Sequence, residues 1–356
     1  MIKYLGSKRL LLPRITALVR GMRGVRTALD LFSGTSRVAF ALKQLGLVVT
    51  ANDHLEYAAT LARGHVEADA DRVTRAAERL IGELSRLPGA PGYFTETFCE
   101  RSRFLHPKNG ARVDAIRERI ESLAVDEPLR SVLLVSLMEA ADRVDSTTGL
   151  QMAYLKSWAA RAHKPLELRL PAILPGPGRA TQLDAEEAAG RFEADLVYLD
   201  PPYNQHRYLG NYHVWESLVR WDKPGVYGVA CKREDCRDYR SAFNSRPGIL
   251  PALERVVARL RCRHLVVSFS NEGYVTREAM EALLATRGHV ATVEVDFPRY
   301  VGARIGIHDP AGRKVGRVSH LRNREYLFVV GESSRALEPV LASLSARARD
   351  TVGATA

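Results

Sequence analysis

The chain has 356 residues, of which 46% are apolar and 26% are charged, a composition that predicts a hydrophobic core and excludes a chain disordered throughout. Its longest apolar stretch, Val132 to Leu137, is far shorter than the roughly 20 residues that a membrane-spanning helix needs. Lysine and arginine outnumber aspartate and glutamate by 52 to 41, and this net charge of +11 favours a polyanionic partner. The N-terminus lacks the apolar run of a secretory signal, so we expect a cytoplasmic protein.

The first fifty residues predict a helix, a strand, a second helix and a second strand. Apolar residues recur at helical spacing over 8–19 and over 38–45. Apolar runs over 26–32 and 47–51 each end in small or polar residues, as strands do. Strand, helix and strand in this order are typical of a βαβ unit, which implies a parallel sheet.

From about residue 55 to residue 158 the sequence favours helices. Apolar residues at helical spacing predict helices at 66–87, 113–123 and 129–143, and strand signals are nearly absent. The proline-rich segment 165–177 then predicts a connector that leads back to the sheet. A helical insertion therefore interrupts the α/β pattern.

Strand patterns resume after this insertion. Apolar runs over 195–199 and 264–269, typical of buried strands, are each followed by polar residues. The segments 293–307 and 315–330 flank the turn signal Asp309-Pro310-Ala311-Gly312, which predicts an antiparallel hairpin at the far edge of the sheet. The tail after Glu332 is expected to start as a helix and to fray.

The sharpest motif is Asp200-Pro201-Pro202-Tyr203, directly after the apolar run 195–199. Loops at the carboxyl ends of parallel strands are where α/β sheets bind ligands. Asp200 offers a carboxylate acceptor, and the double proline stiffens the loop so that the Pro201 carbonyl is a second, fixed acceptor. Two neighbouring acceptors suit one NH₂ group, and Tyr203 offers a ring on which a base can stack.

Such a pair of acceptors solves a chemical problem of aromatic amines. The lone pair of adenine's exocyclic nitrogen is delocalised into the ring, which makes this nitrogen a poor nucleophile. Holding both hydrogens draws the nitrogen toward a tetrahedral geometry and frees the lone pair by positioning and electrostatics, without a metal. The tetrapeptide alone is equally compatible with a rigid turn that has no chemistry.

The loop Asp30-Leu31-Phe32-Ser33-Gly34-Thr35-Ser36 is the second motif. Small residues between a strand and its helix let the backbone approach a ligand closely. Asp53 lies about twenty residues farther along, at the end of the next strand, where an acidic residue typically accepts the hydroxyls of a ribose. This part of the chain therefore predicts a nucleoside site, although a tight turn explains the loop alone.

At this point the sequence resembles the Dam-type adenine-N6 DNA methyltransferases over nearly its full length and in the same motif order. Lys3-Tyr4-Leu5-Gly6-Ser7-Lys8-Arg9 is similar to the opening motif, so the resemblance implies that Tyr4 and Lys8 contact S-adenosylmethionine. Phe32 and Gly34 match the F-x-G-x-G loop, in which Ser36 replaces the usual second glycine.

The remaining family motifs follow in order. Asp53 matches the ribose acceptor, and Asp184 in Gln182-Leu183-Asp184-Ala185 resembles the residue that meets the adenine of the cofactor. Asp200, Pro201, Pro202 and Tyr203 match the catalytic motif throughout, with Asp200 also expected to face the cofactor. The segments 268–271 and 323–328 are similar to the late strand motifs of the family.

The resemblance implies a Rossmann-like methyltransferase sheet, mostly parallel, with an antiparallel edge hairpin and a helical insertion. We expect a catalytic domain formed by 1–64 and 165–332, an insertion at 65–164 for recognition of the DNA target, and a C-terminal tail at 333–356. The expected partner is double-stranded DNA, bound by a monomer in the cytoplasm at the nucleoid. A cognate restriction endonuclease remains open as a further partner.

Basic residues suggest two surfaces for DNA. Between 299 and 324 there are seven lysines and arginines but one acidic residue, Asp309. In the segment 204–244, aromatic and basic side chains alternate, as nucleic-acid contacts often do, whereas Trp215 and Trp221 are expected to pack in the core. The four cysteines include no C-x-x-C pair, so no metal is expected.

Two alternatives remain open from the sequence. One is a methyltransferase for the adenine of RNA or for another amino group, because Asp-Pro-Pro loops also serve such enzymes. The other is a DNA-binding protein that keeps the fold without catalysis, against which the presence of Lys8, Asp53, Asp200 and Tyr203 argues.

Overall fold

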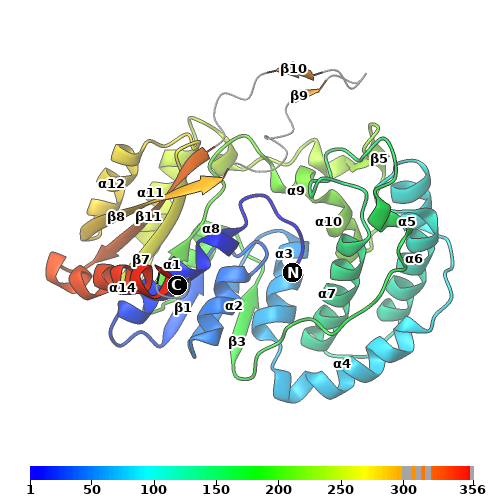
Figure 1. The fold of residues 1–356 in the computed structure, drawn as a ribbon, viewed down its shortest axis with the longest axis horizontal. Helices are drawn as coiled ribbons and strands as arrows, with labels where there is room; N and C mark the ends of the chain where they lie inside the picture. The colour runs from blue at the N-terminus through cyan, green and yellow to red at the C-terminus, as the bar shows by residue number, and fades with distance from the viewer. Residues whose placement is uncertain (299–306, 309–313, 317–321, 353–356) are drawn as a thin grey trace. The chain divides into compact units, whose positions relative to one another are not determined.

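The computed structural model describes residues 1–298, 307–308, 314–316 and 322–352 of the chain (Figure 1). Contacts divide the chain into two compact units. Unit 1 consists of Met1–Ser7, Ser33–Asp184 and His206–Arg240, and unit 2 consists of Lys8–Phe32, Ala185–Gln205 and Ser241–Ala356. The predicted division into a catalytic domain of 1–64 and 165–332, an insertion at 65–164 and a tail at 333–356 stays a prediction.

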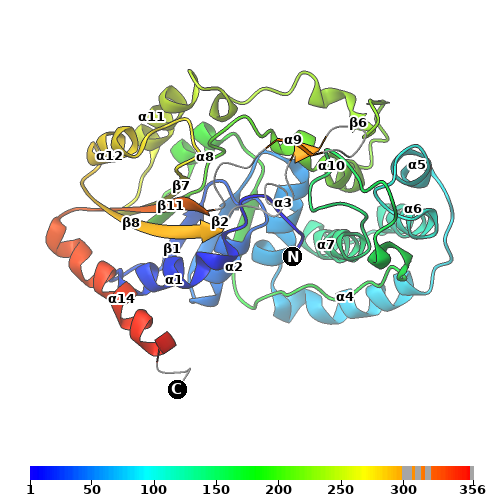
Figure 2. The same cartoon turned by 45° about the horizontal axis from the view of Figure 1, so that its top comes forward.

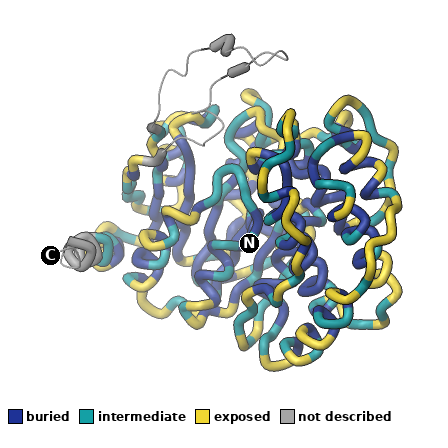
Figure 3. The backbone as a smooth tube through the Cα atoms, turned by 45° about the vertical axis from the view of Figure 1, so that its right-hand side comes forward, coloured by how far each residue is buried: buried dark blue, intermediate teal, exposed yellow. Residues whose placement is uncertain are grey.

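Unit 2 is built on the strands β1 (Thr27–Asp30), β4 (Leu196–Leu199), β7 (His264–Ser270), β11 (Arg322–Gly331) and β8 (His289–Pro298), in that order. The first three are parallel, and β11 runs antiparallel to both β7 and β8. Every residue of β4 and β7 is buried, which is why both strands are continuous apolar runs (Figure 3). The mixed α/β class and the antiparallel edge pair are confirmed.

The register of the edge pair joins Arg322 to Pro298 and Gly331 to His289. A separate two-stranded pair is formed by β9 (Ile307–His308) and β10 (Lys314–Gly316), which run antiparallel. The predicted turn at 309–312 and most of the predicted basic segment 299–324 lie outside the described residues.

Helices cover both faces of these strands (Figure 2). On one side lie α8 (Ala185–Arg191), α11 (Ile249–Arg259) and α12 (Arg277–Ala285), and on the other α1 (Leu12–Gly21) and α14 (Ser334–Val352). Helix α14 packs on α1 and buries Leu337 and Val340, so the tail is helical over a longer stretch than its composition suggested. Short 3₁₀ turns occur at η1 (Lys8–Leu10) and η6 (Ala242–Asn244).

Unit 1 contains the parallel strands β2 (Val48–Asn52) and β3 (Gly178–Thr181) together with a large group of helices. Helix α7 is buried around most of its circumference and forms the centre of this group, whereas α4 buries only the stripe Val73, Ala77, Leu80, Ile81 and Leu84. All described elements from 65 to 164 are helices, as the sequence predicted. The helices of unit 1 as a whole are α2 (Arg37–Gln44), α3 (Glu56–Ala62), η2 (Arg63–Glu67), α4 (Ala70–Ser85), α5 (Tyr93–Thr95), η3 (Glu96–Glu100), α6 (Pro107–Glu121), α7 (Glu127–Arg143), η4 (Ala160–His163), α9 (Tyr208–Asn211), α10 (His213–Arg220) and η5 (Glu234–Cys236).

A two-stranded ribbon of β5 (Val226–Tyr227) and β6 (Lys232–Arg233) completes unit 1. Arg233 is buried and pairs with Asp222 at 2.7 Å and Asp235 at 2.9 Å, so its guanidinium holds this loop together and is not a free DNA contact. Trp215 is in the core, as predicted, whereas Trp221 is only partly buried and packs against the core. None of the helices in the described ranges has the length and apolar character that a bilayer-spanning segment requires.

Candidate active site

The Asp-Pro-Pro-Tyr loop of unit 2 begins directly where β4 ends. Strand β4 lies between the parallel strands β1 and β7, so this loop is at the carboxyl edge, where α/β sheets bind ligands. Pro201 is buried, and no described residue donates a hydrogen bond to its carbonyl oxygen. The acceptor that the motif predicts is therefore not engaged by a donor within the described part of the chain.

A buried lysine holds the carboxylate of this loop. Lys8 Nζ lies 3.0 Å from Asp200 Oδ1 and 3.5 Å from Glu325 Oε2 of β11, and the Lys8 side chain is only 5% exposed. Burial favours the neutral amine, but the two carboxylates outweigh it and raise the Lys8 pKa well above its ordinary value. Lys8 is thus an ammonium ion shared by two carboxylates.

Burial raises the pKa of Asp200 to about 6, although the Lys8 ammonium opposes this shift. The negative charge of Glu325 contributes to this rise in the Asp200 pKa. Asp200 is therefore mostly ionised at pH 7 and keeps the acceptor character that an amine requires.

Tyr203 is held from two sides. Its backbone carbonyl accepts a hydrogen bond from Tyr274 N at 2.9 Å, and its ring packs edge-on against Phe269 with centroids 5.7 Å apart. The Asn204 carbonyl accepts a bond from Asn244 Nδ2 at 2.7 Å. These contacts fix the loop that carries the predicted stacking ring.

In unit 1 the small-residue loop is tied to Asp53. Gly34 N donates to Asp53 Oδ2 at 3.0 Å, and Leu55 N donates to Oδ1 at 3.1 Å. Gly34 has a φ of +50° and Ser36 a φ of +57°, both in the left-handed region. The glycine that the resemblance expects at 36 is thus the residue that this backbone favours, and Ser36 adopts the conformation under strain.

The Tyr4 ring lies in an aromatic stack within unit 1. Its centroid is 4.6 Å from that of Tyr212 and 5.2 Å from that of Tyr208, and its hydroxyl is 3.2 Å from the Tyr57 hydroxyl. A Cβ at Gly34 would come within 3.2 Å of the Tyr4 ring, a crowded contact that glycine avoids. The structure therefore brings Tyr4, Gly34 and Asp53 together.

A second aromatic pair lies beside Asp53. The rings of His54 and Tyr239 are stacked 5.5 Å apart, and the Tyr239 hydroxyl is 2.6 Å from His54 Nε2. Burial raises the Tyr239 pKa, and the charges of Asp53 and Asp184 add to this effect. Asp184 is exposed directly before α8 and is close enough to act on the same hydroxyl as Asp53.

These residues fit a nucleoside with an attached amino acid, such as S-adenosylmethionine. Asp53 uses one hydrogen bond on each oxygen and keeps further lone pairs for two ribose hydroxyls, and its side chain remains 14% exposed. The close approach of Tyr4 to Gly34 places an aromatic ring beside the loop that is bonded to Asp53. Phe32, the other predicted cofactor residue, belongs to unit 2, where it packs against Phe243 at 5.1 Å.

Sequence reasoning did not identify Glu325, Tyr57, Tyr208 or Tyr212 as parts of these clusters. The three tyrosines are far apart in the sequence, and no local pattern links them. Glu325 did carry a signal, because it shares one strand face with Leu327 and Val329, and both of these are buried. A charged residue at such a position indicates a specific partner.

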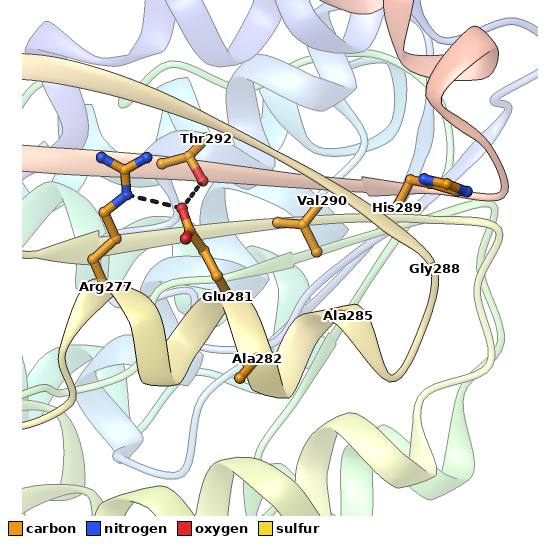
Figure 4. A pocket seen from close by; sticks show the side chains of 8 residues that line it. All are labelled: Arg277, Glu281, Ala282, Ala285, Gly288, His289, Val290 and Thr292. Carbon is orange, nitrogen blue, oxygen red and sulfur yellow. Dashed lines mark hydrogen bonds and ion pairs between the residues drawn. The ribbon is translucent and has the colours of Figure 1, made fainter.

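Other features of the structure lie apart from these residues. A pocket of unit 2 is lined by α12 and the start of β8, where Arg277 and Thr292 both bind Glu281 (Figure 4). None of the predicted site residues lines it. Within the described ranges, no cluster of three histidine, cysteine or acidic side chains could hold a metal ion.

Comparison with known proteins finds relatives that are named modification methylases and type II methyltransferases. It is 30% identical to modification methylase StsI of Streptococcus sanguinis, over 84% of this chain and 49% of that protein. It is 28% identical to type II methyltransferase M.NlaIII of Neisseria lactamica, over 84% of this chain and 92% of that protein. It is also 28% identical to type II methyltransferase M.FokI of Planomicrobium okeanokoites, over 83% and 48%.

The chain thus spans about half the length of StsI and M.FokI but nearly all of M.NlaIII. Residues 4–281, which run from Tyr4 past the Asp-Pro-Pro-Tyr loop, match the family of D12 class N6 adenine-specific DNA methyltransferases, and this chain belongs to that family.

Proposed function

We propose that the chain transfers a methyl group from S-adenosylmethionine to the exocyclic nitrogen of an adenine in a short, specific sequence of double-stranded DNA. The observation that carries this proposal is the Asp200 carboxylate, ionised beside the Lys8 ammonium, next to the unengaged Pro201 carbonyl at the carboxyl edge of β4. Membership of the D12 family supports adenine and DNA as the targets.

In this proposal, Asp200 and the Pro201 carbonyl accept the two hydrogens of the amine and direct its lone pair toward the methyl donor. Pro202 keeps the loop rigid, and Tyr203 stacks on the base. The adenine must first leave the duplex stack, which costs a few kcal/mol that stacking and backbone contacts offset. The bound cofactor supplies the electrophilic methyl group.

Tyr4, Gly34, Phe32, Asp53 and Asp184 would hold the cofactor, with Asp53 on the ribose hydroxyls. Lys8 is also proposed to contact the cofactor, and its ammonium already lies on Asp200. Asp200 is likewise proposed to face the cofactor as well as the amine.

The wider setting follows from the relatives. Their names, modification methylase and type II methyltransferase, support a restriction–modification system, in which a cognate endonuclease cuts the unmethylated sequence. We propose that this chain acts as a monomer on DNA in the cytoplasm, at the nucleoid, with the helical segment 65–164 in target recognition.

A labelled-donor assay tests the proposal. Purified protein is incubated with S-adenosylmethionine carrying a tritiated methyl group and with duplex DNA, duplex RNA or a protein mixture. Label in duplex DNA alone is the expected result. Label in RNA would favour the RNA methyltransferase alternative, and DNA binding without label in any polymer would favour a non-catalytic DNA-binding protein.

A further inference from the structure

Two carboxylates of unit 2, the buried Glu325 and the partly exposed Asp200, share one ammonium. Lys8 Nζ lies 3.0 Å from Asp200 and 3.5 Å from Glu325, and the side chains of Lys8 and Glu325 are only 5% and 7% exposed. Lys8 is placed there by the 3₁₀ turn η1, Asp200 by the end of β4 and Glu325 by β11. Three separate elements thus converge on a group with one net negative charge.

Glu325 depends on this arrangement. Its Oε2 is buried and accepts no hydrogen bond from the described residues, and among them Lys8 is its ion-pair partner. Its backbone is fixed opposite Ser270 in the β11–β7 register. Because a buried carboxylate is costly without a countercharge, a Glu325 side chain without Lys8 would be strongly unfavourable.

The arrangement bears on how Asp200 meets its substrate. The proposed reaction requires Asp200 to accept hydrogens from an amine, yet one of its oxygens is held by Lys8. If Lys8 leaves Asp200, its ammonium needs another buried partner. The Glu325 oxygen is 3.5 Å away, and a lysine side chain is flexible enough to move between two acceptors.

We propose that Glu325 is a positioning residue that keeps Lys8 beside Asp200 and takes over its ammonium when the target amine engages the Asp200 carboxylate. This inference rests on the proposed function and deepens it. Glu325 touches neither the base nor the donor and acts through Lys8.

The first test replaces the charge and keeps the shape. Glu325→Gln leaves Asp200 as the one carboxylate for Lys8, so release of Asp200 becomes harder and we expect kcat to fall roughly 10–100-fold with cofactor affinity unchanged. The matched control is Glu294→Gln on the neighbouring strand β8, whose carboxylate pairs with Arg277 and Arg324. Turnover of E294Q should equal that of the wild type.

The second test does not depend on activity. In protein labelled with ¹³C at the aspartate carboxyl carbon, the Asp200 signal is assigned by its absence in Asp200→Asn and titrated in the wild type and in E325Q. The Asp200 pKa should be lower in E325Q, because one negatively charged neighbour is lost and the Lys8 ammonium pairs with Asp200 alone. The titratable groups around Asp200 are Lys8, Glu325, Tyr198 and Tyr203. Asp30 in turn acts on Tyr198, and Glu272 acts on Tyr203.

Glu325→Asp covers the case in which E325Q does not fold. It keeps the charge and withdraws the carboxylate by about one methylene, so its turnover should lie between those of E325Q and the wild type, with an Asp200 titration close to the wild type. The inference is overturned if E325Q has wild-type turnover and an unshifted Asp200 titration. Where E325Q is unfolded, wild-type turnover of E325D overturns it. A wild-type protein that methylates no nucleic acid refutes the proposed function instead, and the titration still tests the coupling.

Discussion

Two aspartates follow strands of this protein, one in each unit, and they are held in opposite ways. Asp53 follows β2 and accepts backbone N–H groups from Gly34 and Leu55. Asp200 follows β4 and is held by the ammonium of a lysine side chain. One carboxylate is fixed by backbone amides of two loops, and the other by a side chain that can move.

This difference suits two tasks. Backbone amides are part of the loop and cannot leave, so Asp53 presents its remaining lone pairs in a constant direction, as a bound ribose requires. Lys8 can exchange one acceptor for another, so Asp200 can be stabilised before the substrate arrives and then freed for the amine. Binding and chemistry are therefore expected to fail separately when each aspartate is replaced.

The largest effect is expected for Asp200. Asp200→Ala removes an acceptor of the amine and leaves Lys8 with Glu325, so methyl transfer should fall by at least about 1,000-fold. The affinity for S-adenosylhomocysteine, measured by calorimetry, should stay within about threefold. Asp238→Ala, at an exposed site, is the control. Substantial methyl transfer by D200A would contradict the assigned role.

Replacement of Asp53 should produce the complementary result. Asp53→Ala removes the proposed ribose acceptor and frees the Gly34 amide, so the Kd for S-adenosylhomocysteine should rise roughly 10–100-fold. At saturating cofactor kcat should be largely retained, while the exposed control Asp71→Ala should change neither quantity. Unchanged affinity in D53A would exclude this aspartate from the cofactor site.

The pH dependence sharpens the role of Asp200. Burial raises its pKa to about 6, and the carboxylate form is the acceptor, so turnover should fall about tenfold for each pH unit below 6. Because the folded state binds this proton more readily than the unfolded chain, Asp200 favours folding increasingly as pH falls from 7 to 5. A pH–rate profile combined with urea unfolding at each pH separates the two effects. A rate constant that stays level down to pH 4 would contradict the assignment.

The smallest effect concerns the loop that holds Asp53. Ser36 has a φ of +57°, and its buried hydroxyl has no hydrogen-bond partner among the described residues. Ser36→Gly should raise the free energy of unfolding by about 1 kcal/mol, because relief of the left-handed strain exceeds the entropy cost of glycine. Ser33→Gly at a neighbouring position without positive φ should give no such gain. Destabilisation by S36G greater than that by S33G would refute the strain argument.

Much of the fold was predictable because burial leaves apolar runs in the sequence. The runs at 195–199 and 264–269 became β4 and β7 almost residue for residue, and the helical spacing at 129–143 became α7. Strand β3 was missed, because Gly178-Arg179-Ala180-Thr181 is short and polar and depends on its pairing with β2. A strand that forms mainly through pairing with a neighbouring strand leaves no pattern in its own sequence.

The candidate site shows the same limit. Asp53 and Asp200 were identified because each directly follows a strand, a position that the sequence reveals. The groups that hold these aspartates were not identified from the sequence. Lys8 was assigned to the cofactor from its motif, but its ion pairs with Asp200 and Glu325 join residues up to 317 positions apart. Contacts of this separation leave no periodicity, and only the buried charge at Glu325 indicated that a partner was required.

The most direct measurement identifies the methylated nucleoside and its sequence context. DNA from cells that express the wild type or D200A is digested and analysed by mass spectrometry, and the modified positions are mapped by single-molecule sequencing. We expect N6-methyladenine in one short sequence, present with the wild type and absent with D200A. Methylation of cytosine, or N6-methyladenine that persists with D200A, would contradict it.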